Sequence, residues 1–156
     1  MTAAAIAADL HAAIDAALDV FQHVDEPRTA SRPAEGKWCA REILGHLVDS
    51  ACNNHRRFVI GQDSGPIAFD GYEQDAWVAR QRYAEVPFRD LVALWTTYNR
   101  HLAHVIASVP AEALVRSGRA PDGRSDVTLQ FLMEDYVRHL RHHLDQLRVR
   151  LSHTQN

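Results

Sequence analysis

The sequence lacks an excess of positive charge, since its formal net charge is −3 at pH 7. Nucleic-acid-binding domains carry a basic surface, so we expect no nucleic-acid partner. The sequence also lacks any apolar run approaching the roughly 20 residues that span a bilayer, so we expect no membrane partner. Its alanine-rich start contains Asp9, Asp15 and Asp19, which do not fit the apolar segment of a secretory signal peptide.

Cysteine is scarce as well. The only two, Cys39 and Cys52, fall in one predicted helix at a spacing that matches no zinc or redox motif. Free cysteine usually packs as a small hydrophobic residue, and free thiols persist in reducing compartments. We therefore expect two small buried residues in a protein of the reducing cytoplasm.

Glycine and proline are absent from residues 126–151, where apolar residues recur every three or four positions. This period predicts an amphipathic helix, and similar patterns predict helices over residues 2–24, 39–61 and 88–108. No internal repeat and no convincing strand is present. Helices of about 20 residues favour an all-α four-helix bundle, and we expect residues 1–156 to form a single domain.

The connectors carry information about topology. Residues 62–87 separate the second and third long helices, whereas an antiparallel helix pair needs only about 2–8 residues. A parallel crossover would use this length, and residues 74–83 within it predict a short extra helix. Long connections of this kind often cover a functional site.

Histidine is abundant, with ten residues in the chain. His139 and His143 are four residues apart, so a helix places them one turn apart on one face, where they can share a metal ion. By angular position His143 lies within the apolar arc of its helix, His139 lies at the edge, and His142 points toward solvent. The pattern leaves two interpretations open, namely metal ligands or buried neutral histidines with local hydrogen bonds.

The helix over residues 39–61 offers His46 and His55 as a third ligand. His55 falls within the apolar arc, so burial favours it. His46 falls on a polar stripe with Asp49, Asn53 and Arg57, and a polar stripe in a cleft can provide groups that orient a ligand. The pattern alone does not decide between the two histidines.

Two short segments carry distinctive patterns. Residues 36–50 read Gly-Lys-Trp-Cys-Ala-Arg-Glu-Ile-Leu-Gly-His-Leu-Val-Asp-Ser, and residues 139–143 read His-Leu-Arg-His-His. The first resembles the DinB-like superfamily signature, in which a tryptophan opens the second helix and His-Leu-x-Asp-Ser follows. The second is similar to the family's His-x-x-His-His motif. The resemblance covers nearly the whole chain.

The resemblance implies a four-helix bundle with up-down-down-up topology and a homodimer. It also implies a divalent metal ion, bound in a cleft by His46, His139 and His143, and so selects His46 over His55. Imidazole ligands suit several transition metals, of which zinc and nickel are the ones we expect here.

Three histidines leave a metal ion with an open coordination position, as in catalytic zinc sites. Such a position can activate water for hydrolysis or hold a thiol as its thiolate. The DinB-like superfamily includes thiol-dependent transferases, so we expect a metal-dependent enzyme with a small-molecule substrate. We place transfer with a low-molecular-weight thiol ahead of hydrolysis. The alternative is a non-catalytic metal-binding protein of the stress response.

Supporting roles can be assigned to two further residues. Asp49 lies one turn from His46 and is the candidate catalytic residue, because it could orient that imidazole or act as a base. A carboxylate facing solvent or pairing between helices is the other interpretation. Arg57 could bind a substrate carboxylate or form an ordinary salt bridge.

Overall fold

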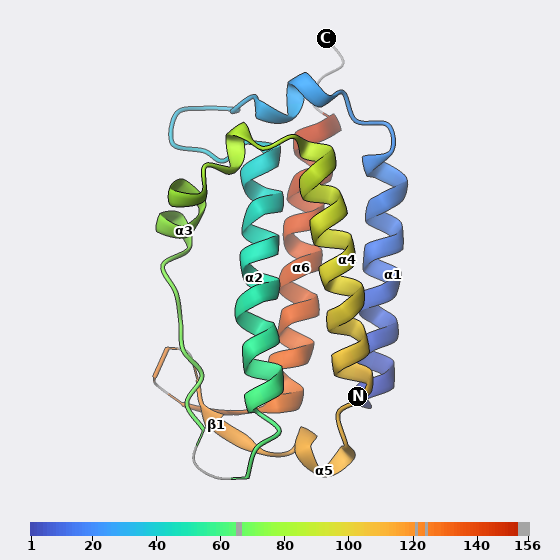
Figure 1. The fold of residues 1–156 in the computed structure, drawn as a ribbon, viewed down its shortest axis with the longest axis vertical. Helices are drawn as coiled ribbons and strands as arrows, with labels where there is room; N and C mark the ends of the chain where they lie inside the picture. Colours follow the sequence, from blue (N-terminus) through green and yellow to red (C-terminus); the bar gives the residue numbers. More distant parts are fainter. Residues whose placement is uncertain (65–66, 121, 124, 153–156) are drawn as a thin grey trace.

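The chain folds as a four-helix bundle. Its long helices are α1 (Ala3–Phe21), α2 (Ala40–Ile60), α4 (Phe88–Ala107) and α6 (Leu129–Ser152). The computed structural model describes residues 1–64, 67–120, 122–123 and 125–152. Figure 1 shows α1 and α6 running in one direction and α2 and α4 in the other, which confirms the up-down-down-up topology.

Helix α2 is the central element. It packs against α4 and α6, and also against η1 (Glu26–Ala30), α3 (Gln74–Gln81) and η2 (Tyr83–Glu85). The polar stripe predicted for this helix is therefore largely covered by other elements. Six of its polar or charged side chains are buried, namely those of Glu42, His46, Asp49, Ser50, Asn54 and Arg57.

Helix α1 closes the other side of the bundle, between α4 and α6. Its apolar period buries Ile6, Leu10 and Ile14, and burying each such side chain stabilises the fold by about 1.5–3 kcal/mol. Phe21 packs edge-on against Trp95 of α4, with 5.9 Å between ring centroids. This half of the bundle has an apolar core.

The crossover from α2 to α4 runs alongside α2 and carries α3 and η2 (Figure 1). The predicted short helix over residues 74–83 ends earlier, because Arg82 adopts a left-handed conformation with φ of 54°. Tyr83 then packs against Gly45 of α2, where a Cβ atom would lie 2.2 Å from the tyrosine ring. Gly45 thus lets the crossover approach α2 closely, beside His46.

A small antiparallel pair, β1 (Ser117–Arg119) and β2 (Asp126–Thr128), precedes α6. The expectation of no strand, and of a helix from residue 126, is therefore wrong. Val127 and Thr128 are β-branched and favour extended backbone. The Thr128 hydroxyl accepts a hydrogen bond from the Phe131 amide at 3.1 Å, which satisfies a free donor at the start of α6. A short helix, α5 (Ala111–Leu114), lies between α4 and β1.

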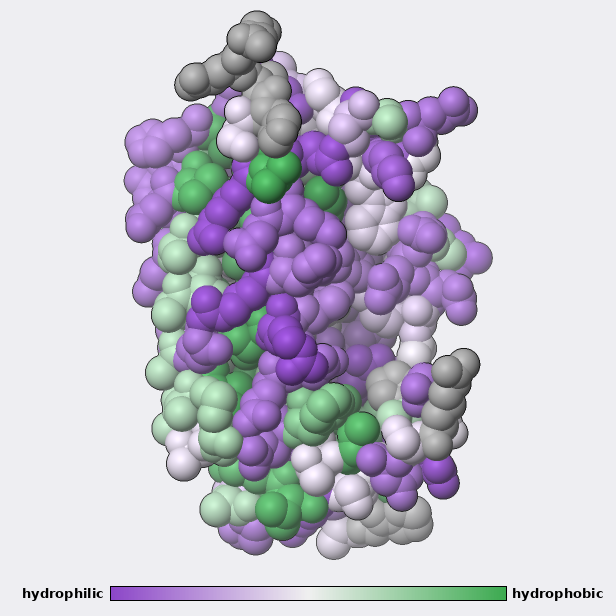
Figure 2. Space-filling view, turned by 180° about the vertical axis from the view of Figure 1, so that it is seen from behind, coloured by the Kyte–Doolittle hydropathy of each residue, from purple (hydrophilic) through white to green (hydrophobic). Residues whose placement is uncertain are grey.

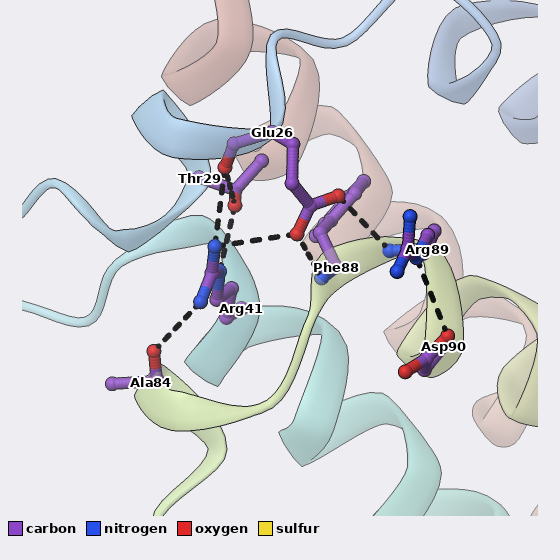
Figure 3. A network of polar contacts seen from close by, with 7 residues as sticks. All are labelled: Glu26, Thr29, Arg41, Ala84, Phe88, Arg89 and Asp90. Carbon is purple, nitrogen blue, oxygen red and sulfur yellow. Dashed lines mark hydrogen bonds and ion pairs between the residues drawn. The ribbon is translucent and has the colours of Figure 1, made fainter.

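A polar network fixes the end of the bundle where α2 and α4 begin (Figure 3). The Arg41 guanidinium donates to the Thr29 hydroxyl at 2.8 Å and to the Ala84 carbonyl at 3.1 Å. The Glu26 carboxylate accepts from the Phe88 amide at 2.5 Å. These contacts join η1, α2 and η2 to the first turn of α4.

The cysteines differ in their surroundings. Cys39 is buried at the start of α2, as predicted, but Cys52 is exposed on the same helix, so that part of the prediction is wrong. Cys52, Arg56 and Val59 are spaced i, i+4 and i+7 on α2, and all three side chains lie on the exposed face of that helix. Within the described residues, every helix is too short or too polar to cross a membrane.

Candidate metal centre

Three histidines meet where α2 packs against α6. The Nε2 atom of His139 lies 3.4 Å from Nε2 of His46 and 3.1 Å from Nε2 of His143. One ligand atom from each of the three residues lies within 4.8 Å of the others. The structure thus brings together the three side chains that the resemblance implied.

The arrangement follows from the local geometry of α6. The spacing of four residues places the His139 and His143 rings edge to face, with their centroids 4.5 Å apart. Leu140 and Leu144, one position further along, are buried and hold this face of α6 against the bundle. His142 is exposed, which agrees with its predicted position toward solvent.

Burial keeps all three rings neutral. The pKa of His46 is lowered from 6.5 to about 3, mainly by burial and then by the neighbouring charges of His143 and His139. Burial also lowers the pKa of His139 to about 4 and lowers that of His143. A neutral imidazole has the free lone pair that a metal ligand needs.

The contacts of the other ring atoms orient two of the rings. His143 Nδ1 lies 2.9 Å from the Gln146 side-chain oxygen, which selects the tautomer with the proton on Nδ1. The Nε2 atom of His143 is then free to accept or to coordinate. The Trp38 ring packs against the His46 ring, with 5.2 Å between centroids. The sequence analysis assigned no role to Gln146. Its position three residues after His143 on a helix nevertheless places it beside that ring.

The donor set fits a divalent metal ion. Nitrogen ligands at about 2.0–2.1 Å from a tetrahedral ion lie about 3.3 Å apart, close to the two distances observed. Hydrogen bonding explains the cluster less well, because the single Nε2 of His139 faces two other nitrogens. A ring nitrogen carries one proton or one lone pair, so a hydrogen bond satisfies only one of these contacts. A shared metal ion would satisfy both.

His55, the other candidate on α2, lies away from this cluster. Its Nδ1 atom is 3.2 Å from the Tyr98 hydroxyl of α4, and its ring packs edge-on against His101 at 5.2 Å. Among the described residues, His55 and His101 belong to no group of three potential ligands with convergent atoms. The structure therefore distinguishes His46, which lies in the cluster, from His55, which does not. The sequence pattern alone left this choice open.

Asp49 is buried on the side of α2 that faces the crossover. One carboxylate oxygen, Oδ1, accepts hydrogen bonds from the Tyr83 hydroxyl and the Gln81 amide, both at 2.7 Å. The other, Oδ2, has no hydrogen-bond partner within the part of the chain that the structure describes. Burial raises the pKa of this carboxyl, and the bonds from Tyr83 and Gln81 partly offset that effect.

The remaining polar residues of the stripe have structural contacts. The Arg57 guanidinium donates to the Asp70 carbonyl and to the Asn54 side chain, so it ties the crossover to α2. The Asn53 amide donates to the backbone of its own helix, at the Asp49 carbonyl. Within the described residues, Arg57 forms these hydrogen bonds in place of the predicted salt bridge, and its contact with a substrate carboxylate stays a prediction.

A large open cleft, of about 1590 Å³, reaches the cluster at the end of the bundle. His143, Gln146 and Trp38 line it, together with the segment of residues 31–38 and the last turns of α6. Ligand pockets commonly measure about 300–1,000 Å³, so this cleft has room for a substrate beside the histidines.

Two curated bacterial proteins are similar to this chain. One, from Halalkalibacterium halodurans, is named "Putative metal-dependent hydrolase BH0277" and is 24% identical over 131 residues, which cover 84% of this chain and 75% of that protein. The other, from Bacillus subtilis, is named "Putative metal-dependent hydrolase YfiT" and is 26% identical over 111 residues. That match covers 70% of this chain and 62% of YfiT.

The fold is also that of a solved structure. YfiT from Bacillus subtilis, described as "a probable metal-dependent hydrolase with an unusual four-helix bundle topology", superposes with a TM-score of 0.77 at 20% identity. The superposition covers 97% of this chain and 84% of that one. A model of the DinB superfamily matches residues 9–147, which include all three histidines of the cluster. The chain therefore belongs to the DinB superfamily.

Proposed function

We propose that this chain is a hydrolase that uses a divalent metal ion held by His46, His139 and His143. The observation that carries the proposal is the convergence of three neutral imidazoles whose central nitrogen faces the other two. The names of the two curated relatives support hydrolysis as the reaction. Zinc and nickel are the ions we expect, because both accept imidazole ligands.

The residues of the chain prepare the site for such an ion. When bound, a divalent ion supplies a Lewis acid that lowers the pKa of a coordinated water or thiol. Burial lowers the pKa of all three rings, so each neutral ring keeps one unprotonated nitrogen at neutral pH, and Gln146 holds the His143 ring in the coordinating tautomer. The Trp38 ring covers His46, which is 0% exposed, and so keeps bulk water from that side.

Asp49 is the candidate general base. Its buried carboxylate is anchored through one oxygen by Tyr83 and Gln81, and it lies one helical turn from His46. Its raised pKa moves it toward the range in which a base is effective near neutral pH. Asp49→Asn should lower kcat and remove the acidic limb of the pH–rate profile while metal content stays unchanged. An unaltered profile would exclude Asp49 as the base.

Thiol transfer is the second candidate, and the charge of the site is compatible with it. Three neutral ligands would leave the two positive charges of the ion uncompensated. Either a thiolate or a hydroxide could therefore bind at the open position. A low-molecular-weight thiol could therefore serve as the second substrate. Dependence of product formation on added thiol separates the two reactions.

Elemental analysis of untagged protein tests whether the chain binds a divalent metal ion through these histidines. Wild type should contain about one equivalent of a divalent ion, and His143→Ala should lose it. His142→Ala is the matched control, because His142 neighbours His143 on α6 but is exposed. Retention of metal by His143→Ala, or absence of metal from wild type after incubation with zinc and nickel, would overturn the proposal.

Activity requires a second measurement. Metal-loaded protein should hydrolyse simple ester, amide or thioester substrates faster than the His143→Ala variant, without added thiol. Turnover only with thiol would replace hydrolysis by transfer. Bound metal with neither activity would favour the non-catalytic metal-binding alternative.

The homodimer and the cytoplasmic location are further proposals. The family resemblance supports the dimer, and the small number of cysteines supports a reducing compartment. Light scattering on the eluting protein should give a mass of twice the 17.6 kDa chain. A monomer mass at micromolar concentration would exclude a stable dimer.

A further inference from the structure

The cleft beside His143 has an unusual charge for this chain. Its lining includes the basic residues Arg28, Arg32, Lys37, Arg148 and Arg150 against the acidic residues Asp25, Asp75 and Asp145. The whole chain carries a formal net charge of −3, so basic residues are locally enriched here. A cleft of one dominant charge concentrates ligands of the opposite charge.

Two of these basic side chains are available to a ligand. Arg32 pairs with Glu42 at 2.6 Å, and Arg148 pairs with Asp145 at 2.9 Å, so both are engaged. Within the described part of the chain, the Lys37 ammonium has no ion pair or hydrogen bond, and Arg150 Nε is buried without a partner. Lys37 precedes Trp38 directly, and Arg150 lies two turns beyond His143 on α6.

Apolar side chains line the same cleft between these charges. They are Val20, Val24, Trp38, Ile43, Val149 and Leu151. Figure 2 shows hydrophobic patches among hydrophilic side chains near the top of the view. The lining therefore combines an aromatic and aliphatic wall with unpaired positive charge.

We propose that the cleft binds substrates with an apolar, ring-containing body and an anionic oxygen group, which Lys37 and Arg150 recognise. The inference rests on the proposed function for the reaction itself, since His143 lines the same cleft. The ring packs on Trp38, beside His46, and the anionic group lies toward the open end. Carboxylate, phosphate and sulfonate share this chemistry.

Fluorescence titration of metal-free protein tests the proposal with a matched pair of probes. The dye 8-anilinonaphthalene-1-sulfonate carries the anionic group, and N-phenyl-1-naphthylamine has the same rings without it. Two lost charge contacts in a partly exposed site correspond to about a 5- to 10-fold change in Kd. The Lys37→Gln/Arg150→Gln variant should weaken sulfonate binding by this factor and leave binding of the neutral probe unchanged.

A second double variant controls for net charge. Arg89→Gln/Arg100→Gln removes two exposed cations outside the cleft and should bind both probes as wild type does. Circular dichroism checks that all variants fold. The inference would be overturned if the Lys37→Gln/Arg150→Gln variant lost affinity for both probes equally. Equal affinity of the two double variants for the sulfonate probe would also overturn it. Displacement by benzoate against phenyl phosphate then separates a carboxylate substrate from a phosphate ester.

The outcomes for the two proposals are distinguishable because the probe titration needs no metal. Metal bound at the histidines without selective sulfonate binding would overturn only this inference. Selective sulfonate binding in a protein that takes up no metal would overturn the proposed hydrolase, and with it the assignment of the anion as a substrate.

Discussion

Helix α2 carries a histidine cluster on each of two sides, and the two clusters look alike in ring geometry. The α2–α6 cluster comprises His46, His139 and His143, with ring centroids 4.5–5.2 Å apart. The α2–α4 cluster comprises His55, Tyr98 and His101, with His55 5.7 Å from Tyr98 and 5.2 Å from His101. Proximity of aromatic rings alone does not distinguish them.

The clusters differ in burial and in where their nitrogens point. His46 is fully buried and its pKa falls to about 3, whereas His101 is exposed. His55 has a hydrogen-bond partner in Tyr98, so its polar atom is satisfied without an ion. In the α2–α6 cluster the nitrogens converge on one point. A metal site thus requires convergent, desolvated donors, and only the α2–α6 cluster has them among the described residues.

The largest expected difference between the clusters is in metal affinity. His139→Ala should weaken zinc binding by more than about 100-fold, because loss of a group that merely orients a ligand already costs about 10–100-fold. His101→Ala, in the α2–α4 cluster, should bind zinc as wild type does. Calorimetric titration of metal-free protein measures both. Similar losses of zinc affinity in the two variants would contradict the assignment of the metal site to the α2–α6 cluster.

Thermal stability should show the next largest difference. Zinc at about 1,000 times its Kd stabilises the folded state by about 4 kcal/mol, which raises Tm by about 10 °C in a chain of this size. Wild type and His55→Ala should both show this increase relative to chelator-treated protein. His143→Ala should show none. A wild-type Tm that is insensitive to chelator would contradict the metal assignment.

Acidification of the metal-free protein should also separate the clusters. Because the folded-state pKa of His46 is about 3, below its ordinary value of 6.5, the unfolded chain binds more protons between these values. The free energy of unfolding should therefore fall as pH drops from about 6.5 toward 3. His46→Gln should reduce this dependence more than His55→Gln does, because burial also lowers the pKa of His55 but that side chain is only half-buried. Urea denaturation at pH 7 and pH 5 measures the slope, and equal slopes in wild type and His46→Gln would contradict it.

The smallest expected difference concerns two tyrosines on either side of α2. Tyr83→Phe removes a donor from the buried Asp49 carboxylate and should lower the free energy of unfolding by about 1–3 kcal/mol. Tyr98→Phe removes a partly exposed contact to His55 and should cost less than about 1 kcal/mol. Urea denaturation at pH 7 compares them. A larger loss of unfolding free energy in Tyr98→Phe than in Tyr83→Phe would contradict the inference that the Tyr83 contact is the more buried of the two.

Local features of the site could be predicted from the sequence. The spacing of His139 and His143, and the exposure of His142, follow from helical geometry within α6. Gln146 follows from the same geometry, three residues after His143, although the pattern gave no reason to single it out. The strand at residues 126–128 was missed because helical periodicity was extended through Val127 and Thr128, whose extended conformation depends on pairing with β1.

The choice between His46 and His55 could not be made from the pattern. Both lie on α2, and angular position placed His55 within the apolar arc and His46 on the neighbouring polar stripe with Asp49. Packing of α3, η2 and α6 around α2 buries that stripe, and only the resemblance to known signatures selected His46 beforehand. Exposure of Cys52 was missed for a different reason, because the prediction relied on the general tendency of free cysteine to be buried and not on its position on the helix.

By itself the sequence determined the long helices, the parallel crossover and the pairing of two histidines on one helical face, because periodicity and spacing act within a single element. The tertiary structure decided which side of α2 meets α6, and hence which histidine completes the cluster. It also decided that Arg57 ties the crossover to α2 and that Lys37 and Arg150 share a cleft. These outcomes depend on contacts between segments far apart in the chain, which no local pattern encodes.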